Sequence, residues 1–435
     1  MTGLRYKALL LATAPMLAAG LAGSAHAAAF YLQEQSVRGA GRAFSGEGAD
    51  TGAASLWWNP AAIGGMTGVD GALGLSAILP KAHVDDRGTL IVRPGQAPAP
   101  VGGDPYARNP INDGYLPSGA VSAAIGGTGF SVGLAVTSPF SFTTNYDANS
   151  WARYTADRTR LRTIDLQPTL AWGNGMISLG VGLNAEHADA ILSNALPNLS
   201  GALPDGEQTL SGKGWDFGWS AGAQLHSGPL SVGLSYKSSV RHKLNGSITT
   251  TGLLGPLAAP PATINTATSA SFRTPWQAIA GVRFRATDRL TLNAQAVRIG
   301  WKKFDAIRLG APLNAAIPEN YRNTWSFAGG VDYAVTPDWT LRAGVQHDQS
   351  PTHDGARDAR VPDSDRWNYA VGTSYRVSKA FTIDAAASYI DFKDAPIDRV
   401  TAAYAGSAAQ TPILVNGELH NAHALVLSLG GRFSF

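Results

Sequence analysis

From about residue 69 to the C-terminus, apolar side chains recur at every second position, and this pattern limits the chain to β-strands. The C-terminal stretch ALVLSLGGRFSF is the clearest case, with Leu425, Leu427 and Leu429 on one face and Ser428 and Gly430 on the other. A period of two places successive side chains on opposite faces of a strand. The same alternation recurs in MISLGVGLNAEH, LSVGLSYK, WTLRAGVQ and FTIDAAASY. Each strand therefore meets an apolar medium on one face and a polar one on the other.

The composition separates a membrane barrel from a soluble sandwich. Hydrophobic residues make up 44% of the chain, yet no run of 18 apolar residues follows the N-terminal segment, so transmembrane helices are not expected. The polar face is rich in Gly, Ser and Thr, which suits a crowded, wet lumen better than a close-packed core. A net charge of +3 is too weak to suggest nucleic acid, and the lack of cysteine argues against a small disulfide-bonded fold.

Residues 1–27 have the features of an export signal. Two basic residues precede an apolar stretch at 8–21, and Ala25-His26-Ala27 forms a cleavage site. We expect the mature chain to start at Ala28, with a cut after the Ala-x-Ala of residues 27–29 as the alternative. The apolar stretch is too short for a membrane anchor, and no lipidation cysteine follows it.

Short turns alternate with long connections along the mature chain. The short turns are expected at 126–129, 173–176, 226–229, 286–289, 335–338 and 377–380. The long connections are expected at 81–116, 139–161, 189–213, 244–269, 301–321, 349–364 and 392–421. This alternation is typical of outer-membrane barrels. It predicts an all-β fold, a transmembrane antiparallel barrel of about fourteen strands, with both chain ends in the periplasm of a Gram-negative bacterium.

Aromatic residues near the expected strand ends fit the girdles at the two membrane interfaces. They are Trp172, Trp276, Trp301, Tyr333, Trp339, Trp367, Tyr375 and Tyr389. The C-terminal Phe435 is expected to be read by the outer-membrane assembly machinery. Outer-membrane lipid and lipopolysaccharide are the expected surroundings of the barrel, and a monomer is the expected state.

The segment before the first strand is expected to fill the barrel. A lumen of about fourteen strands is too wide for side chains alone to fill, and residues 28–67 are too apolar to lie free in water. We therefore predict a signal at 1–27, an N-terminal hatch at 28–67 and a barrel at 68–435. Trp57 and Trp58 should anchor the hatch against the wall or lumen, while Asn59-Pro60 should turn the chain away from helix geometry.

The stretch AFYLQEQSVRGAGRAFSGEGADTGAASLWWNPA resembles the hatch of the FadL-type outer-membrane transporters of long-chain fatty acids. This family also includes channels for toluene and xylene, and the triplet Asn59, Pro60, Ala61 matches its hatch motif. Further blocks match in order: TSPFSFTTNY, WARYTADRTRLRTIDLQPTLAW, GLSYKSSVRHKLNG, LRAGVQHDQSPT and VPDSDRWNYAVGTSYRVS. The resemblance covers essentially the whole mature chain.

The resemblance implies passive uptake of hydrophobic small molecules. A ligand would be captured among extracellular loops, pass to a lumen pocket near the hatch, and leave sideways through a passage at a kink in the third strand. By our count the third strand runs from Phe130 to Ser138, so the kink would lie at Ser138, Pro139 and Phe140. A proline there cannot donate to the sheet ladder.

Two long loops have the composition of a capture groove, because they carry apolar residues and almost no charge. The candidates are Ile191, Leu192, Leu196 and Leu199 in the stretch 189–203, and Leu253, Leu254 and Leu257 in the stretch 252–264. The alternative is that these loops pack on one another and form a lid.

The substrate stays open between a fatty acid and an aromatic or aliphatic hydrocarbon. A fatty acid would need a cation for its carboxylate, and the alternation places Arg283, Arg342 and Arg366 on the lumen face. The same arginines could instead form ion pairs with the hatch or the wall. A general diffusion porin is a weaker alternative, because it would need an open lumen.

Sequence motifs for catalysis, cofactors and metals are weak. Residues 218–222 match the G-x-S-x-G elbow of hydrolases, but they lie within an alternating strand rather than at a strand-to-helix turn. We therefore expect a protein that is not an enzyme and has no cofactor. The histidines show no metal-ligand spacing; His420 and His423 are expected at a solvated loop-to-strand junction.

Overall fold

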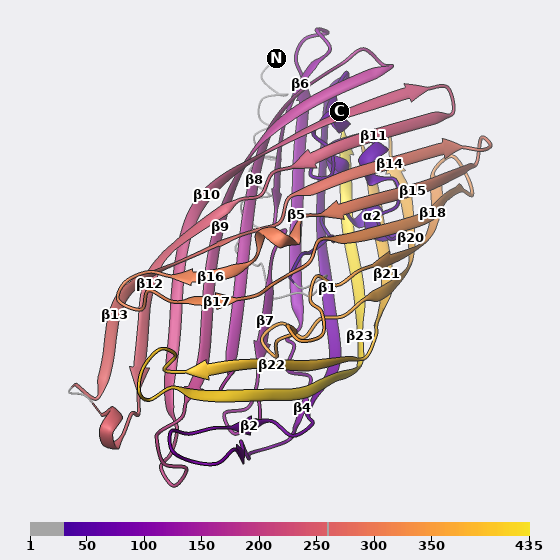
Figure 1. The fold of residues 1–435 in the computed structure, drawn as a ribbon. Helices are drawn as coiled ribbons and strands as arrows, with labels where there is room; N and C mark the ends of the chain where they lie inside the picture. Colours follow the sequence, from indigo (N-terminus) through magenta and orange to yellow (C-terminus); the bar gives the residue numbers. More distant parts are fainter. Residues whose placement is uncertain (1–29, 259–260) are drawn as a thin grey trace.

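The computed structural model describes residues 30–258 and 261–435, so the predicted signal at 1–27 lies outside the described residues. The chain forms a closed antiparallel barrel, taller than it is wide, with short turns and the C-terminus at one end and long loops at the other (Figure 1). These ends are called the turn end and the loop end. Among the described residues, no helix is long and apolar enough to cross a membrane.

Fourteen strands build the wall, as the turn count predicts. In chain order they are β1 (Val69–Asp86), β5 (Gly114–Ala124), β6 (Phe130–Thr137), β8 (Arg158–Gly173), β9 (Ile177–Leu196), β10 (Gly206–Ser227), β11 with β12 (Leu230–Lys237, Arg241–Thr251), β13 with β14 (Thr263–Arg273, Gln277–Arg285), β15 (Leu290–Ile299), β18 (Thr324–Ala334), β19 (Trp339–Asp348), β20 (Arg366–Ser378), β21 (Phe381–Phe392) and β23 (Thr411–Ser434). Pairing of β1 with β23 closes the barrel.

The six expected short turns all lie at the turn end, but several of the long connections are shorter than expected because the adjoining strands extend beyond the apolar belt. The stretches 189–213, 244–269 and 392–421, which the sequence assigns to loops, hold the ends of β9, β10, β12, β13 and β23. Strand segments outside the membrane need no apolar outer face, so hydrophobic alternation fades while backbone pairing continues.

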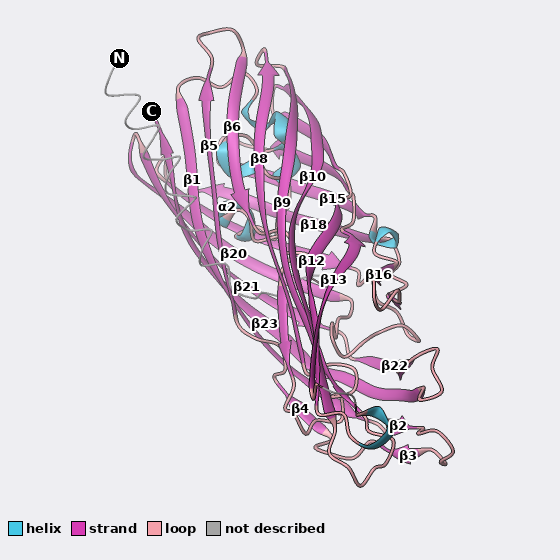
Figure 2. Cartoon of the chain, turned by 90° about the vertical axis from the view of Figure 1, so that its left-hand side faces the viewer, coloured by secondary structure: helices cyan, strands magenta, loops and turns pink. Residues whose placement is uncertain are grey.

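Shorter elements lie in the long connections between the wall strands. They are β2 (Leu90–Ile91), β3 (Ala99–Pro100), β4 (Tyr106–Arg108), η5 (Gly255–Leu257), η6 (Trp301–Lys303), β16 (Ala306–Leu309), β17 (Ala316–Pro318) and β22 (Ala395–Ala403). Strand β4 pairs with the end of β1, and β22 pairs with β23, both in antiparallel orientation. Strands β16 and β17 lie about halfway along the barrel, whereas β2, β4 and β22 lie near the loop end (Figures 1 and 2).

Two wall strands are interrupted at the same height, which the sequence pattern does not reveal. The first break separates β11 from β12 at residues 238–240, and the second separates β13 from β14 at residues 274–276. One backbone hydrogen bond joins the two breaks, from the amide of Thr274 to the carbonyl of Val240 at 3.0 Å. Side chains add two more: the Ser239 hydroxyl donates to the carbonyl of Thr274 at 2.6 Å, and the amide of Val240 donates to the hydroxyl of Thr274 at 3.2 Å.

The third wall strand is kinked where the sequence places its end. Strand β6 stops at Thr137, and the chain pairs with β8 again only in β7 (Phe142–Asn145). Four residues of this strand, 138–141, face three residues of β8, 162–164, so the extra residue bulges out of register.

Residues 30–63 lie inside the barrel and are almost all buried. They form α2 (Val37–Ala40) and three short 3-10 helices: η2 (Glu47–Ala49), η3 (Ala53–Ser55) and η4 (Pro60–Ile63). Helix α2 contacts β20, β21 and β23, η2 contacts β11 and β14, η3 contacts β1 and β5, and η4 contacts β8, β9 and β10. This segment therefore touches wall strands from all around the lumen, and we call residues 30–67 the hatch.

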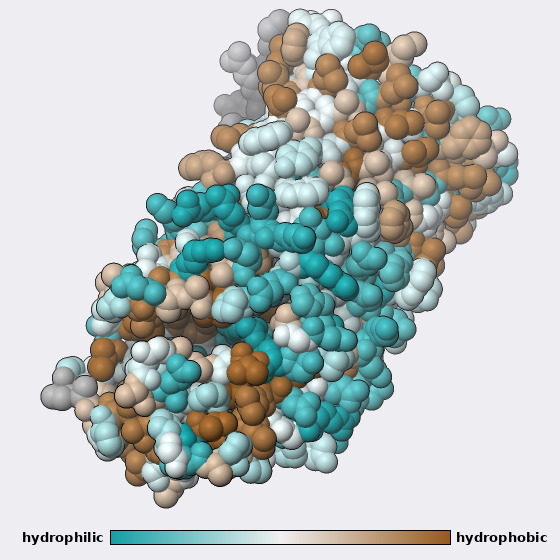
Figure 3. Space-filling model, in the orientation of Figure 1, coloured by the Kyte–Doolittle hydropathy of each residue, from teal (hydrophilic) through white to brown (hydrophobic). Residues whose placement is uncertain are grey.

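On the face of the barrel that Figure 3 shows, the outer surface is apolar toward the turn end and hydrophilic toward its middle. The predicted girdle residues Tyr333, Trp339, Trp367, Tyr375 and Tyr389 are exposed on it, as an interfacial role requires. The expectation that Trp301 belongs to the girdle is wrong, because its side chain is fully buried in the lumen. Trp301 begins the short helix η6 after β15, where the strand alternation no longer decides which way a side chain points.

Candidate functional site

The two hatch tryptophans are fully enclosed. The Trp57 ring stacks on Tyr31 at a centroid distance of 6.1 Å and lies 4.1 Å from the Nζ atom of Lys237. The Trp58 ring stacks on Phe44 at 5.6 Å, and the Trp58 carbonyl accepts a hydrogen bond of 2.7 Å from Ser235 of the wall. The adjacent tryptophans thus tie the hatch both to itself and to the barrel.

Asn59, Pro60 and Ala61 begin a helical turn rather than turning the chain away from one. Asn59 caps η4 by accepting a hydrogen bond of 2.9 Å from the amide of Ala61, and Pro60 takes the first helical position. This corrects the sequence expectation: the fixed φ of proline suits the first position of a helix. The Asn59 amide also donates to the carbonyl of Gly48 at 2.7 Å, which joins two parts of the hatch.

Glycines on the lumen face of the wall allow the hatch to approach this closely. A Cβ atom added to Gly222 of β10 would lie 1.8 Å from Oδ1 of Asn59, and one added to Gly180 of β9 would lie 2.3 Å from the carbonyl carbon of Pro60. The small residues of the lumen face therefore make room for the hatch as much as for water.

A buried ion-pair network joins the hatch to the wall. Arg42 of the hatch contacts Asp50 at 2.6 Å and Asp332 of β18 at 3.2 Å. Arg283 of β14 bridges the same two carboxylates at 3.0 and 2.8 Å, and Arg342 of β19 contacts Asp332 at 3.2 Å. Charges buried on both sides of the boundary compensate each other, so separating hatch and wall would expose unpaired ions.

The three arginines that the alternation places in the lumen are therefore engaged with carboxylates. Arg366 also pairs with Asp348 at 2.6 Å and with Asp363 at 3.1 Å. Arg283, Arg342 and Arg366 thus form the ion pairs that the sequence left open as an alternative, and none of the three lines the lumen cavity described below.

The start of the hatch is bonded to the kink in the third strand. The amide of Leu32 donates to the carbonyl of Pro139 at 2.8 Å, and the amide of Ser141 donates to the carbonyl of Phe30 at 2.9 Å. Tyr31 and Phe140 are thus opposed as in an antiparallel ladder. The side chain of Gln35 adds a bond of 3.0 Å to the carbonyl of Ser138. At the kink, the backbone of Ser138, Pro139 and Phe140 therefore pairs with the hatch instead of with a wall strand.

The kink leaves part of the wall unpaired. Strands β5 and β6 pair only as far as Gly119↔Val136, whereas β5 continues to pair with β1 as far as Gly114. Toward the loop end, the segment before β5 pairs with β7 at one bridge among the described residues, Ile111↔Thr144. The backbone of residues 114–118 therefore has a wall partner on one side, and a lateral break in the sheet lies beside the kink.

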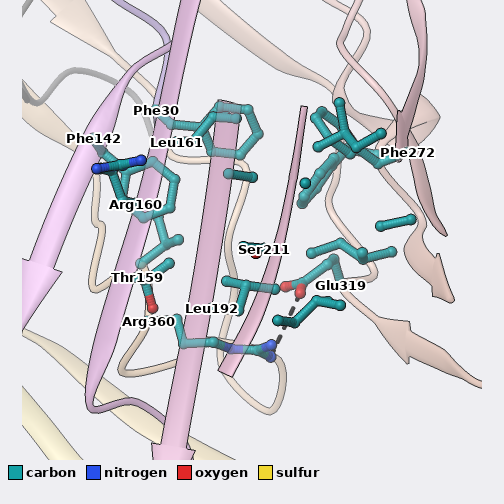
Figure 4. Close-up of a pocket in the computed structure, with 18 of the residues that line it drawn as sticks. Phe30, Phe142, Thr159, Arg160, Leu161, Leu192, Ser211, Phe272, Glu319 and Arg360 are labelled. Carbon is teal, nitrogen blue, oxygen red and sulfur yellow. Dashed lines mark ion pairs between the residues drawn. The ribbon is translucent and has the colours of Figure 1, made fainter. Parts of the chain in front are cut away.

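An open cavity lies in the lumen on the loop side of the hatch, and the space between its walls is about 690 Å³ with the adjoining solvent included. Its walls are mainly aliphatic and aromatic, and Phe30 at the start of the hatch forms one side (Figure 4). The lining residues are Phe30, Phe142, Thr159, Arg160, Leu161, Ala190, Leu192, Leu210, Ser211, Gly212, Leu244, Ala270, Phe272, Phe304, Ile307, Glu319, Tyr321, Arg360 and Val361. Such a lining suits an apolar ligand with a small polar end.

One end of the cavity is charged. Arg360 faces Glu319 across 3.5 Å and binds Asp358 at 2.6 Å, while Arg399 contacts both acids (Figure 4 shows the first pair). Burial raises the pKa of Glu319 to about 7, because the two guanidinium groups offset it only in part. Burial opposes ionisation of Asp358 as well, but Arg360 and Arg399 outweigh it and lower the pKa of Asp358 to about 2. Of these two acids, Glu319 is therefore the one whose pKa is raised toward neutral pH.

The predicted capture residues do not lie in one open groove. Leu192 lines the cavity, Ile191 and Leu196 lie in β9 rather than in a loop, and Leu254 is exposed. Leu199 is half-buried beyond β9, while Leu253 and Leu257 are half-buried in the neighbouring loop. Asn198 joins the two loops, because its side chain accepts from the amide of Leu254 at 2.8 Å and donates to the carbonyl of Gly252 at 3.2 Å. The two stretches therefore contact each other, which is the arrangement expected if they form a lid.

Sequence reasoning missed most of the cavity. Phe272 ends β13, Phe304 and Tyr321 lie in the loop between β15 and β18, and Arg360 belongs to the next long loop. They meet only because the loops fold inward over the lumen. The one local signal was a cluster of aromatic residues in a loop that should otherwise be polar.

Comparison with known proteins identifies a family. Residues 18–435 match the family model described as outer membrane protein transport protein (OMPP1/FadL/TodX). A long-chain fatty acid transport protein of Escherichia coli is 27% identical over 406 residues, which cover 84% of this chain and 87% of that protein. The outer membrane protein P1 of Haemophilus influenzae is 26% identical over 432 residues, covering 89% and 91%.

Solved structures agree on the fold. A FadL homologue from Pseudomonas aeruginosa superposes with a TM-score of 0.80 at 26% identity, covering 93% of this chain and 99% of that one. The toluene transporter TbuX of Ralstonia pickettii reaches 0.62 at 17% identity, covering 92% and 98%.

Proposed function

The chain belongs to the OMPP1/FadL/TodX family of outer membrane transport proteins, and we propose that it takes up long-chain fatty acids. It resides in the outer membrane of a Gram-negative bacterium, with the turn end toward the periplasm and the loop end outside. The family consists of transport channels rather than enzymes. The choice between fatty acid and aromatic hydrocarbon depends on the cavity, because the family includes carriers of both.

The charged end of the cavity is the observation that favours a fatty acid. A long alkyl chain would lie against Phe30, Leu161, Leu192 and Phe272, where burial contributes about 25 cal/mol per Å² of apolar surface. Its carboxylate would meet Arg360, with Glu319 as the competing anion. A hydrocarbon such as toluene would use the apolar wall alone and would make no demand on Arg360.

The direct test compares the two ligands in one variant. Arg360→Gln should weaken oleate binding by roughly 1.5–3 kcal/mol, the range for a hydrogen bond to a charged group, and leave toluene binding unchanged. Arg308→Gln removes an exposed arginine of β16 and serves as the matched control. An equal loss of affinity for both ligands would contradict a carboxylate site. Undiminished oleate binding would show that the oleate carboxylate binds away from Arg360.

The route follows from three neighbouring features. We propose that residues 28–67 act as the hatch domain of a barrel at 68–435, and that ligand enters the cavity from the loops. Displacement of residues 30–32 from the kink at Ser138, Pro139 and Phe140 would then connect the cavity to the break between β5 and β6. Ligand would leave sideways there into the outer leaflet. A diffusion porin is disfavoured, because the hatch occupies the lumen.

The outer surface suggests the lipid partner. Arg241 and Arg273 are direct cross-strand neighbours, both exposed, and neither forms an ion pair with a described residue. They lie just beyond the stacked rings of Tyr236 and Trp276. Like charges opposite each other are unfavourable unless an anion lies between them, so we propose that lipopolysaccharide phosphates bind here. We also propose that the outer-membrane assembly machinery recognises Phe435 and that the protein is a monomer.

A further inference from the structure

The seam of the barrel contains a bulge. Strands β1 and β23 pair from Asp70↔Ser434 to Asp86↔Gly417, with one irregularity, where Lys81↔His423 is followed by His83↔His420. One residue separates the paired positions on β1 and two separate them on β23, and Asn421 has a φ of 51°. The extra residue reverses which side chains of β23 point outward.

The bulge brings three metal-ligating side chains together on the outer face. The rings of His83 and His420 are 5.2 Å apart at an angle of 86°. Asp85 follows His83 by two residues on the same face, and its Oδ2 lies 2.8 Å from Nε2 of His420. One ligand atom of each residue lies within 4.8 Å of the others. Ligands about 2.0–2.1 Å from a tetrahedral ion lie roughly 3.4 Å apart, so small rotations would close the site.

A second observation points to a cation at this position. Asp85 is 8% exposed, and its Oδ1 is buried without a hydrogen-bond partner among the described residues. A buried carboxylate oxygen is normally satisfied, because losing its hydration is costly. A bound metal ion would satisfy it.

The surroundings allow coordination through Nε2 of His420. The Asn421 amide nitrogen lies 3.0 Å from Nδ1 of that ring. When a metal takes Nε2, the ring proton must sit on Nδ1, and turning the Asn421 amide would present its oxygen to accept that proton. Glu418, the cross-strand partner of Asp85, is held by Arg87. Arg108, opposite His83 on β4, is exposed and can extend into water.

We propose that His83, Asp85 and His420 bind a zinc-class divalent cation that links the first and last strands of the barrel. Two imidazoles and one carboxylate suit Zn²⁺ better than Ca²⁺ or Mg²⁺, which take oxygen ligands. Three protein ligands leave one coordination position for water. The cation would cross-link the seam toward the loop end, and this role is independent of the transported substrate.

Titration of the purified full-length protein tests the site. The protein is stripped with EDTA in detergent and titrated with ZnCl₂ by calorimetry, with CoCl₂ absorption as a probe of coordination geometry. We expect one equivalent of zinc, a tetrahedral cobalt spectrum, and a higher thermal unfolding temperature with zinc. His420→Ala and Asp85→Asn should each weaken zinc binding at least tenfold and abolish the thermal shift.

His187→Ala is the matched control, because His187 also lies on the outer face of a wall strand, beside Trp215. It should bind zinc like the wild type. Heat-modifiability on gels shows that each variant retains its barrel. Absence of saturable zinc binding by the wild type, or undiminished binding by folded His420→Ala, would overturn the proposal.

Discussion

The backbone amide of Leu32 donates a hydrogen bond of 2.8 Å to the carbonyl of Pro139, so the first residues of the hatch hold the kink of the third wall strand. The kink carbonyl would otherwise lack a wall partner, because β6 ends before it and β7 begins after it. The hatch and the lateral break in the wall are thereby one structural unit. Movement of the hatch must alter the kink.

Because the hatch motif packs tightly against the wall, we expect that adding one methyl group at Gly222 raises ion conductance. Gly222→Ala would place a Cβ atom 1.8 Å from Oδ1 of Asn59 and should displace the hatch while leaving strand pairing intact. Ion conductance in planar bilayers should rise, because an unplugged lumen is polar and permeable. Gly329→Ala is the control, since its Cβ would meet no atom within 4 Å. Conductance equal to that of the control would argue against a plug held at Asn59.

The ion-pair network between hatch and wall predicts that neutralising one carboxylate greatly lowers the free energy of unfolding. Asp332→Asn leaves Arg42, Arg283 and Arg342 short of a shared anion, and breaking a buried pair of this kind costs about 3–5 kcal/mol. Denaturant unfolding in detergent measures the loss. Asp338→Asn, which removes an exposed ion pair with Arg376, should cost less than about 1 kcal/mol. Similar losses in both variants would mean that the network contributes little.

Glu319 predicts a pH dependence of fatty acid binding. Its folded-state pKa of about 7 lies above the ordinary 4.5, so its contribution to stability is full below the ordinary value and is lost as the pH rises through about 7. Below that pH the neutral side chain no longer competes for Arg360. Oleate should therefore bind more tightly at about pH 6 than at about pH 8.

Glu319→Gln separates this effect from titration of the ligand itself. At about pH 8 the variant should bind oleate more tightly than the wild type does at the same pH, and the pH dependence that remains in the variant should be that of oleate alone. Toluene binding should not change with pH in either protein. A wild type and variant with the same pH profile would exclude Glu319 from the headgroup site.

The period-two pattern and the turns carried enough information to predict the wall, because each membrane-embedded strand must present apolar side chains to lipid. They could not locate the strand ends outside the membrane, such as β9 up to Leu196, where no lipid imposes the pattern. The breaks at residues 238–240 and 274–276 depend on side-chain hydrogen bonds across strands, which local sequence does not record.

The site was predictable only where the residues lie close together in the sequence. Asn59 and Pro60 were found as a motif, although they start a helical turn instead of preventing one. The pairs Arg360 with Glu319 and His83 with His420 join distant segments. Their proximity results from loop packing and from the register of the seam, neither of which the local sequence pattern specifies.

A reversible cross-link between residues 31 and 140 tests the central claim, that transport requires the hatch to leave the kink. Tyr31 and Phe140 face each other as a pair without mutual hydrogen bonds, for which Cα atoms are about 4.5 Å apart, within disulfide range. The chain has no cysteine, so Tyr31→Cys with Phe140→Cys forms one defined bond. The account predicts that oleate uptake by cells carrying the double variant is blocked when oxidised and restored by reductant, while each single variant is indifferent to redox state. Equal uptake by the oxidised and reduced double variant would contradict it.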